Sequence, residues 1–202
     1  MLLLLALVNW AACSKVTVRN KEFKFNGQKL FLNGANQAWH WYGYDFGDGQ
    51  YYKEPKSVYQ RNIDVMKTNG GNALRVWLHT TGEGPSPNWA SSGHVIGTDK
   101  RGSLVDELTM MLDYAKSKNV FVIISLWDGA NGDISQRVID LMWDDEKLQS
   151  YLDNCLIPMA TALKSHPALL AWEVYNEAEG IVRNEESNTE KCYDTNGLKG
   201  SG

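Results

Sequence analysis

Four apolar runs, separated by segments with helical spacing, constrain the fold of this chain more than any other feature. Each run is continuously apolar and does not alternate with polar residues, which is typical of parallel strands that are covered on both faces. The runs are Lys29–Asn36, Asn72–His79, Val120–Trp127 and Leu169–Val174. Apolar side chains recur at helical spacing between them, over residues 56–68, 103–118, 138–143 and 146–164. This order predicts an α/β fold with a parallel sheet.

The spacing of the runs indicates a (β/α)8 barrel. They begin near residues 30, 73, 120 and 168, which is a repeat of about 40 to 50 residues. Eight units at this spacing need well over 300 residues, more than the roughly 250 of a lean barrel but within its range. The 202 residues therefore hold about the first four βα units. We expect residues 15–202 to be the N-terminal half of a barrel, because no helix is predicted after the fourth run.

The first residues are interpreted as a targeting segment. Residues 1–14 are mostly apolar and end in small residues. This run is shorter than the roughly 20 residues that a membrane helix needs, and it suits a secretory signal peptide. A buried N-terminal strand or helix is the alternative. Alternation from Lys15 to Phe25 around Asn20-Lys21 then predicts a short β-hairpin. We expect a secreted protein that does not associate with membranes.

Net charge, histidine spacing and cysteine content indicate which partners, metal sites and disulfides to expect. The net charge is −4 and no basic run is present, so nucleic acid is not an expected partner. The four histidines are scattered without the spacing of a metal site, so no metal is expected. Once residues 1–14 are removed, Cys155 and Cys192 remain, and an oxidising compartment favours a disulfide between them. Two unrelated thiols are the alternative.

Glu177 is the first candidate for chemistry. It follows the fourth apolar run without a break, and barrels of this kind carry their reactive groups at the C-terminal ends of the strands. A solvated surface carboxylate is the other interpretation, which suits Glu179 better. The chain also has eight Trp and nine Tyr. Most are expected in the core, but several lie near strand ends, where a sugar ring could stack on them.

Four stretches carry a family resemblance: Phe31–Trp39 with Asp45–Gly47, Asn72–Trp77, Ile124–Trp127 and Trp172–Glu177. Together they resemble glycoside hydrolase family five. Within that family they are most similar to the secreted endo-β-1,4-mannanases of molluscs and other invertebrates. The resemblance extends from about residue 16 to the end of the chain.

The resemblance implies a role for each matching residue. Glu177 matches the general acid/base of the family, and Asn176 matches the asparagine that binds the sugar 2-hydroxyl. Arg75 matches the arginine that orients the nucleophile. Four residues match positions that line the glycan cleft, although core packing is the alternative for each: Trp39, Trp77, His79 and Trp127. The resemblance also implies a monomeric enzyme without metal or cofactor, which cleaves β-mannan or glucomannan with retention of configuration.

Two departures from the family pattern stand out. Ala178 replaces the proline that usually follows the Asn-Glu pair, and the family's nucleophile, a glutamate on the seventh strand, lies beyond residue 202. Retaining hydrolysis needs two carboxyl groups about 5–5.5 Å apart. Glu173 cannot be the second one, because an extended strand places it roughly 13 Å from Glu177. The chain alone is therefore expected to be inactive. A cellulase or other β-glucanase of the same clan, and a non-catalytic glycan-binding protein, are the alternatives.

Overall fold

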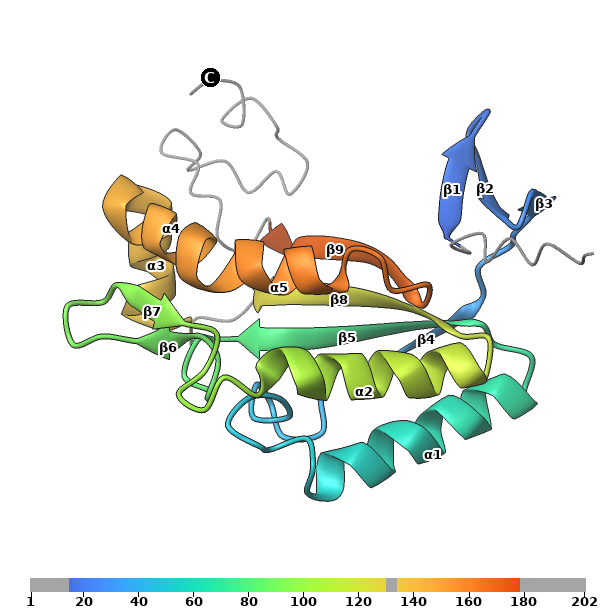
Figure 1. The fold of residues 1–202 in the computed structure, drawn as a ribbon, viewed down its shortest axis with the longest axis horizontal. Coiled ribbons are helices and arrows are strands. Elements are labelled where there is room, and N and C mark those ends of the chain that lie inside the picture. The colour runs from blue at the N-terminus through green and yellow to red at the C-terminus, as the bar shows by residue number, and fades with distance from the viewer. Residues whose placement is uncertain (1–14, 130–133, 179–202) are drawn as a thin grey trace, which may run out of the picture.

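A parallel sheet of four strands forms the centre of the fold in the computed structural model, which describes residues 15–129 and 134–178 (Figure 1). The strands are β4 (Gly34–Asn36), β5 (Ala73–Thr80), β8 (Phe121–Asp128) and β9 (Leu169–Asn176). They neighbour one another in this order, which is also their order in the chain. The predicted α/β class with a parallel sheet is confirmed.

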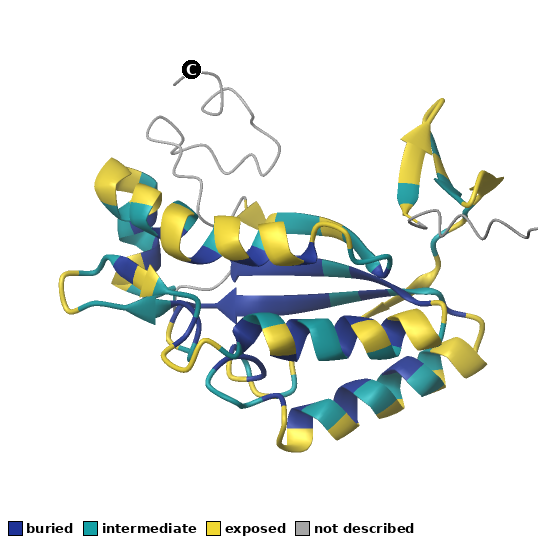
Figure 2. Cartoon of the chain, viewed as in Figure 1, coloured by how far each residue is buried: buried dark blue, intermediate teal, exposed yellow. Residues whose placement is uncertain are grey.

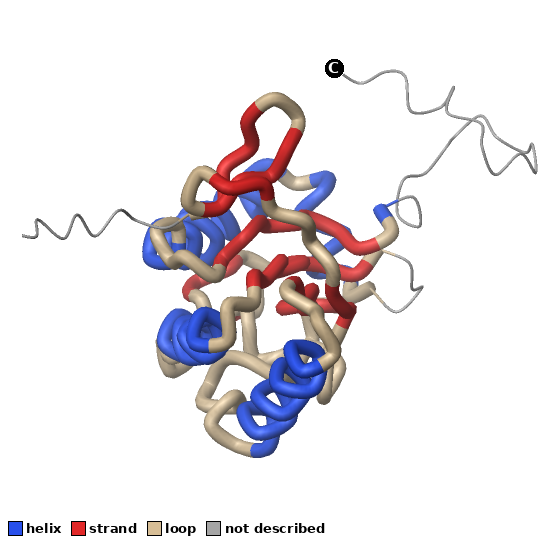
Figure 3. The backbone as a smooth tube through the Cα atoms, turned by 90° about the vertical axis from the view of Figure 1, so that its right-hand side faces the viewer, coloured by secondary structure: helices blue, strands red, loops and turns tan. Residues whose placement is uncertain are grey.

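Helices follow the strands and lie outside the row that the strands form (Figures 1 and 3). The chain order is α1 (Glu54–Thr68), α2 (Leu104–Ser117), α3 (Gln136–Trp143), α4 (Asp145–Tyr151), the π-helical turn η1 (Leu152–Leu156) and α5 (Ile157–Leu163). The first three predicted helices agree with these bounds to within two residues.

The fourth predicted helix, residues 146–164, is interrupted. Pro158 lacks the N–H that would donate to the carbonyl of residue 154, so a regular α-helix cannot continue through it. The structure has the η1 turn at this place, and the N–H of Ile157 donates to the carbonyl of Leu152, five residues earlier. A π-helical turn thus lies directly before the helix that contains the proline.

The core lies between the helices and the sheet, where Figure 2 shows the buried segments of β5 and β8. Alternate side chains of a strand point to opposite faces. Leu74, Val76 and Leu78 of β5 are at most 2% exposed. Leu104, Leu108, Met111, Leu112 and Ala115, the apolar stripe of α2 facing this layer, are fully buried. Arg75 lies between Leu74 and Val76 and is only partly buried, on the opposite face.

The two outer strands differ from the prediction of fully buried runs. Only Gly34–Asn36 of the first run joins the sheet as β4, and all three residues are exposed. In β9, Val174 is 62% exposed. The reason is that β4 pairs only with β5, and β9 only with β8, within the described residues. Gly34 is required by close packing, since a Cβ there would lie 1.6 Å from the carbonyl oxygen of Ala73.

A small antiparallel sheet precedes the parallel one and lies at the N-terminal end of its strands (Figure 1). It contains β1 (Val16–Arg19), β2 (Glu22–Phe25) and β3 (Gln28–Lys29). The predicted hairpin is confirmed: Asn20 and Lys21 both have positive φ, as a tight two-residue turn requires. Lys29, the first residue of the first predicted run, belongs to β3 of this antiparallel sheet and not to the parallel sheet.

The long segment between β5 and α2 contains one more short pair of strands. It is formed by β6 (Asn88–Trp89) and β7 (Val95–Gly97), which are antiparallel. Figure 1 shows this pair and α3 beside the C-terminal ends of the parallel strands, opposite the β1–β3 sheet. Most of the predicted site residues lie on the strands β5, β8 and β9, whereas Trp39 and Glu177 lie in the segments that follow β4 and β9.

Candidate active site

The four parallel strands bring together the polar side chains of the candidate site. Sheet register places Asp128 of β8 directly beside Asn176 of β9, and Asn36 of β4 beside Arg75 of β5. The side chain of Arg75 extends from β5 to β9, where it contacts both Glu173 and Asn176. Direct hydrogen bonds in this cluster therefore join residues that are up to 101 positions apart in the chain.

Arg75 is held by an ion pair and by two amide oxygens. Its Nε and Nη2 both lie 2.7 Å from Oε2 of Glu173. Nη2 also donates to Oδ1 of Asn176 at 2.9 Å, and Nη1 to Oδ1 of Asn36 at 3.4 Å. The sequence rules out Glu173 as a second catalytic carboxylate but does not reveal this role. The one sequence feature that points to this role is the presence of a charged residue, Glu173, inside an apolar strand.

Asp128 is a second residue that the sequence analysis missed. Its carboxylate is 1% exposed and accepts hydrogen bonds from Nδ2 of Asn176 at 3.2 Å and from the Tyr42 hydroxyl at 3.0 Å. The signal was available, since Asp128 follows the third apolar run just as Glu177 follows the fourth. Asn176 itself is 7% exposed, so its amide is held between Arg75 and Asp128.

Glu177 lies directly after β9 with an exposed side chain and a positive φ of 47°. Positive φ is uncommon for a residue other than glycine and marks a sharp turn of the backbone. The neighbouring loop approaches this turn closely. The N–H of Gly129 donates to the carbonyl of Asn176 at 2.7 Å, and a Cβ at residue 129 would lie 2.6 Å from the carbonyl oxygen of Glu177. Gly129 is thus needed for the close approach of β8 and β9.

Aromatic rings adjoin this polar cluster. The Trp39 ring lies 5.0 Å from that of Trp77 and 4.7 Å from that of Tyr42, and it is 40% exposed. Trp77 is 8% exposed and packs against the Arg75 guanidinium, whose Cζ is 5.6 Å from the ring centroid. Of the aromatic cleft residues predicted, Trp39 is therefore the one with substantial exposed surface, and it packs against Trp77. Sugar contact by Trp39 and Trp77 stays a prediction.

His79 and Trp127 are enclosed in the structure, in agreement with the core-packing alternative. They are 0% and 2% exposed, and their ring centroids are 4.6 Å apart. The Nδ1 atom of His79 lies 3.1 Å from the carbonyl oxygen of Ser86. Burial lowers the pKa of His79 to about 3, so its imidazole is neutral at physiological pH. Neither side chain presents a surface on which a sugar could stack.

Two buried carboxylates hold the loop that carries the aromatic residues. Asp45 is 1% exposed and accepts hydrogen bonds from the N–H groups of His40 and Trp41, both at 2.6 Å, and from the Tyr59 hydroxyl at 2.9 Å. Glu107 on α2 is fully buried and accepts three more backbone N–H groups of this loop: those of Gly47, Gly49 and Tyr51. The loop is therefore fastened to α1 and α2.

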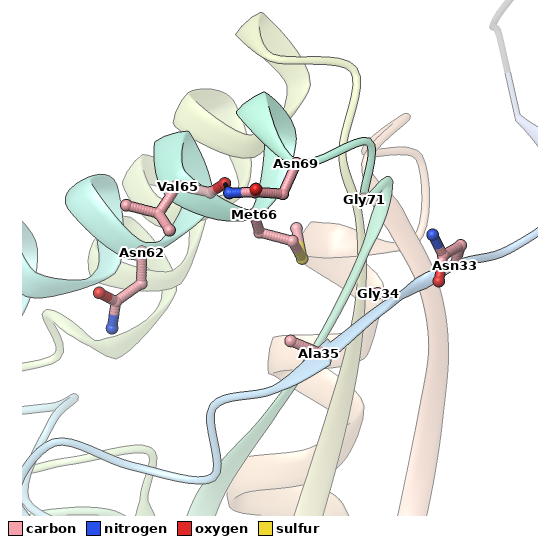
Figure 4. A pocket seen from close by; sticks show the side chains of 8 residues that line it. All are labelled: Asn33, Gly34, Ala35, Asn62, Val65, Met66, Asn69 and Gly71. Atoms are coloured by element: carbon pink, nitrogen blue, oxygen red, sulfur yellow. Dashed lines mark hydrogen bonds between the residues drawn. The ribbon is translucent and has the colours of Figure 1, made fainter.

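A cavity of about 390 Å³ lies elsewhere, between β4 and α1 (Figure 4). Its lining has no ionisable side chain and comprises Asn33, Gly34, Ala35, Asn62, Val65, Met66, Asn69 and Gly71. It follows the unpaired edge of β4 and does not include Arg75, Asn176 or Glu177. We therefore do not assign it to the candidate site.

The remaining predictions concern cations, membranes and the disulfide. Within residues 15–129 and 134–178 no group of His, Cys, Asp and Glu side chains could hold a metal ion. No helix in this part of the chain is long and apolar enough to cross a membrane. Cys155 is a fully buried thiol on η1. Cys192 and the predicted signal peptide lie outside the described residues, so the disulfide and the signal stay predictions.

Comparison with known proteins identifies relatives that match almost the whole chain. No protein-family model matches it. The chain is 46% identical over 180 residues to a mannan endo-1,4-beta-mannosidase of Cryptopygus antarcticus, and 40% identical over 190 residues to that of Mytilus edulis. These alignments cover 89% and 94% of this chain, but 46% and 51% of the two relatives. The chain thus spans about half the length of the curated relatives it matches.

Solved structures agree with the sequence comparison. The crystal structure of an endo-1,4-beta-mannanase from Eisenia fetida superposes with a TM-score of 0.83 at 42% identity, over 93% of this chain and 51% of that one. The expected resemblance, and the assignment of the fold as part of a (β/α)8 barrel, are confirmed.

Proposed function

We propose that this chain, a relative of the invertebrate endo-1,4-β-mannanases of glycoside hydrolase family five, is the N-terminal half of the catalytic barrel of such an enzyme. The observation that carries the proposal is the arrangement at the end of β9. There Asn176 is held by Arg75 and Asp128, and Glu177 follows with its carboxylate exposed. A positioned polar residue beside an exposed carboxylate at a strand end suits the chemistry of a glycosidase.

In the proposed mechanism, Glu177 is the general acid/base. It protonates the oxygen of the departing sugar in the first step and removes a proton from the incoming water in the second. The other carboxylate, which attacks the anomeric carbon, is supplied by the rest of the full-length protein. The two carboxyl groups would lie about 5–5.5 Å apart for a reaction with retention. Glu173 is not available for this role, because it lies four residues before Glu177 on the extended strand β9, roughly 13 Å away.

The proposed substrate is β-1,4-mannan or glucomannan, cleaved internally. Support comes from the names of the relatives and from the exposed ring of Trp39, which packs against Trp77. Aromatic rings with a free face stack well on the apolar faces of sugars. We further propose a secreted, monomeric enzyme whose residues 1–14 are a signal peptide, with a disulfide between Cys155 and Cys192 and no resident cofactor.

The first experiment reads the native transcript beyond the codon for Gly202. We expect it to continue for roughly 150 residues or more and to encode a glutamate at the end of a seventh strand, as an eight-unit barrel requires. A stop codon directly after Gly202 would exclude hydrolysis by this chain, because only one of the two carboxylates would be present. Glycan binding without catalysis would then be the function to test.

The second experiment replaces Glu177 in the full-length enzyme. Glu177→Gln should reduce the turnover of polymeric mannan by roughly 10²–10⁴-fold, because the amide can neither donate nor accept the catalytic proton. Mannan binding should be largely retained. The control is Glu146→Gln, since Glu146 is exposed on α4 and far from these contacts in the chain. Near-normal turnover by Glu177→Gln would refute the assignment.

A third experiment separates mannanase from the alternative β-glucanase. The two substrates differ in the orientation of the sugar 2-hydroxyl, which the full cleft must distinguish. Initial rates are compared on pure mannan, glucomannan and carboxymethylcellulose. We expect cleavage of the first two and little of the third. The opposite order would assign the enzyme to the glucanases of the same clan.

A further inference from the structure

The amide of Asn176 is held at both ends by charged groups. Its Oδ1 accepts a hydrogen bond from Nη2 of Arg75 at 2.9 Å, and its Nδ2 donates to Oδ1 of Asp128 at 3.2 Å. Asn176 is 7% exposed and Asp128 is 1% exposed, so water has little access to either group. These two contacts together determine how the amide is oriented.

The chemistry of the two partners permits only one orientation. A guanidinium group can only donate hydrogen bonds, and an ionised carboxylate can only accept them. If the amide were turned over, its NH2 group would face the donors of Arg75 and its oxygen would face the carboxylate of Asp128. Both contacts would then be repulsive. The positions of oxygen and nitrogen in Asn176 therefore follow from the charges on either side of it.

We propose that Asp128 is a positioning residue of the glycosidase, which orients the Asn176 amide so that one N–H is directed to the 2-hydroxyl of the reacting sugar. This inference rests on the proposed function. The amide nitrogen carries two hydrogens, and Asp128 accepts one of them. The other is the donor for the sugar. Hydrogen bonds to the 2-hydroxyl strengthen in the transition state of glycoside hydrolysis, so this orientation acts on the rate.

Asp128 is itself fixed from two directions. Sheet pairing places it directly beside Asn176, which sets the distance between the two side chains. Its second oxygen accepts a hydrogen bond from the Tyr42 hydroxyl at 3.0 Å. Tyr42 in turn packs against Trp39, with ring centroids 4.7 Å apart. Through Tyr42, Asp128 therefore connects the exposed ring of Trp39 to the Asn176 amide that faces the sugar.

The test uses the full-length enzyme and two matched substrates. Both are aryl β-mannobiosides, and they differ only in the 2-hydroxyl of the sugar that bears the aryl group. The measured quantity is the ratio of kcat/KM for the hydroxylated substrate to that for the 2-deoxy substrate. Asp128→Leu removes one of the two contacts that orient the Asn176 amide and leaves only that with Arg75, so we expect the ratio to fall on the order of tenfold.

Two variants accompany Asp128→Leu. Asp128→Asn keeps an oxygen that can accept from Asn176, so it should restore most of the ratio. Asp64→Leu is the matched control, because Asp64 on α1 also accepts a hydrogen bond from a tyrosine, Tyr114 at 2.7 Å, but lies outside the site. Its ratio should equal that of the wild type. If Asp128→Leu does not fold, shown by loss of its thermal transition, Asp128→Ala takes its place.

The outcomes separate this inference from the proposed function. A wild-type enzyme that hydrolyses neither substrate would refute the function. An active wild type, with Asp128→Leu and Asp128→Ala slowing both substrates by the same factor, would overturn the positioning role, since a general structural defect does not depend on the 2-hydroxyl. A loss restricted to the hydroxylated substrate, with rescue by Asp128→Asn, would support it.

Discussion

His79 illustrates how burial decides the charge of a single residue at the end of β5. Its ring packs against Trp127 and Tyr151, with centroids 4.6 and 5.8 Å away. Nε2 is buried and has no hydrogen-bond partner among the described residues. Burial lowers the pKa of His79 to about 3, although the hydrogen bond to Ser86 acts in the opposite direction. The neutral imidazole is thus a packed polar residue and not a cation of the site.

This pKa predicts how stability depends on pH. In the unfolded chain His79 takes up a proton below about pH 6.5, whereas in the folded chain it stays neutral down to about pH 3. The neutral, buried His79 therefore favours the folded state fully above pH 6.5. Between about pH 6.5 and pH 3 the free energy of unfolding falls on acidification by up to about 1.4 kcal/mol per pH unit. Urea denaturation of the full-length protein at pH 7 and pH 5 measures it.

His79→Asn is the comparison variant, because its amide can still donate to the carbonyl of Ser86. We expect the variant to be less stable than the wild type at pH 7. Between pH 7 and pH 5, however, its free energy of unfolding should fall by about 2 kcal/mol less than that of the wild type. Equal losses in the two proteins would mean that His79 does not titrate differently in the folded and unfolded states.

At the scale of elements, α2 organises the loop that precedes α1. Glu107 accepts hydrogen bonds from the N–H groups of Gly47 and Tyr51 through Oε2, and from Gly49 and the Ser103 hydroxyl through Oε1. Ser103 occupies the N-cap position of this helix. However, its hydroxyl donates to the carboxylates of Glu107 and Asp99 and does not cap the helix. The Asp99 carboxylate accepts the N–H groups of Ser103 and Leu104 at the start of the helix.

Glu107→Gln tests this attachment without changing the size of the side chain. Whichever end of the amide carries the nitrogen, its hydrogens face at least one backbone N–H that has lost its acceptor. We expect a loss of about 2 kcal/mol in the free energy of unfolding. Asp106→Asn, an exposed acid in the same helical turn, should change it by no more than about 0.5 kcal/mol. Equal effects of the two substitutions in urea denaturation would contradict the attachment.

At the scale of the whole molecule, the parallel sheet has two unpaired edges within the described residues. One is β4, beside the cavity of about 390 Å³, and the other is β9, where Val174 is 62% exposed. The matching relatives extend to about twice the length of this chain. In a closed barrel the additional strands would cover both edges.

The open edges predict association of the 202-residue chain when it is expressed alone. Unpaired strands with exposed apolar side chains are templates for pairing with another chain. Sedimentation velocity should therefore show dimers or larger species. Val174→Lys should shift the distribution toward monomer, because a charge on an edge strand opposes pairing. Ile96→Lys is the control, since Ile96 is similarly exposed, at 59%, but lies on β7. A monomeric wild-type chain would contradict the prediction.

The sequence by itself determined the order of elements and the position of the catalytic candidate. Helical and strand spacing are local properties, so three helices, the hairpin at Asn20-Lys21 and the strands β5 and β8 could be predicted within a few residues. Glu177 was identified because it follows an apolar run, and Asn176 because it matches a position of the family that the chain resembles. The interruption before Pro158 could also be predicted, since a missing N–H depends on residue type alone.

The tertiary structure decided which side chains meet and which are covered. Asp128 and Asn176 become neighbours through sheet register, and Arg75 of β5 reaches Glu173 of β9 across the one intervening strand, β8. Neither pairing has a signature in the spacing of residues. The burial of His79 and Trp127, and the exposure of β4 and β9, likewise depend on what packs against them. Register and packing arise from contacts between distant segments, which is why the local pattern could not supply them.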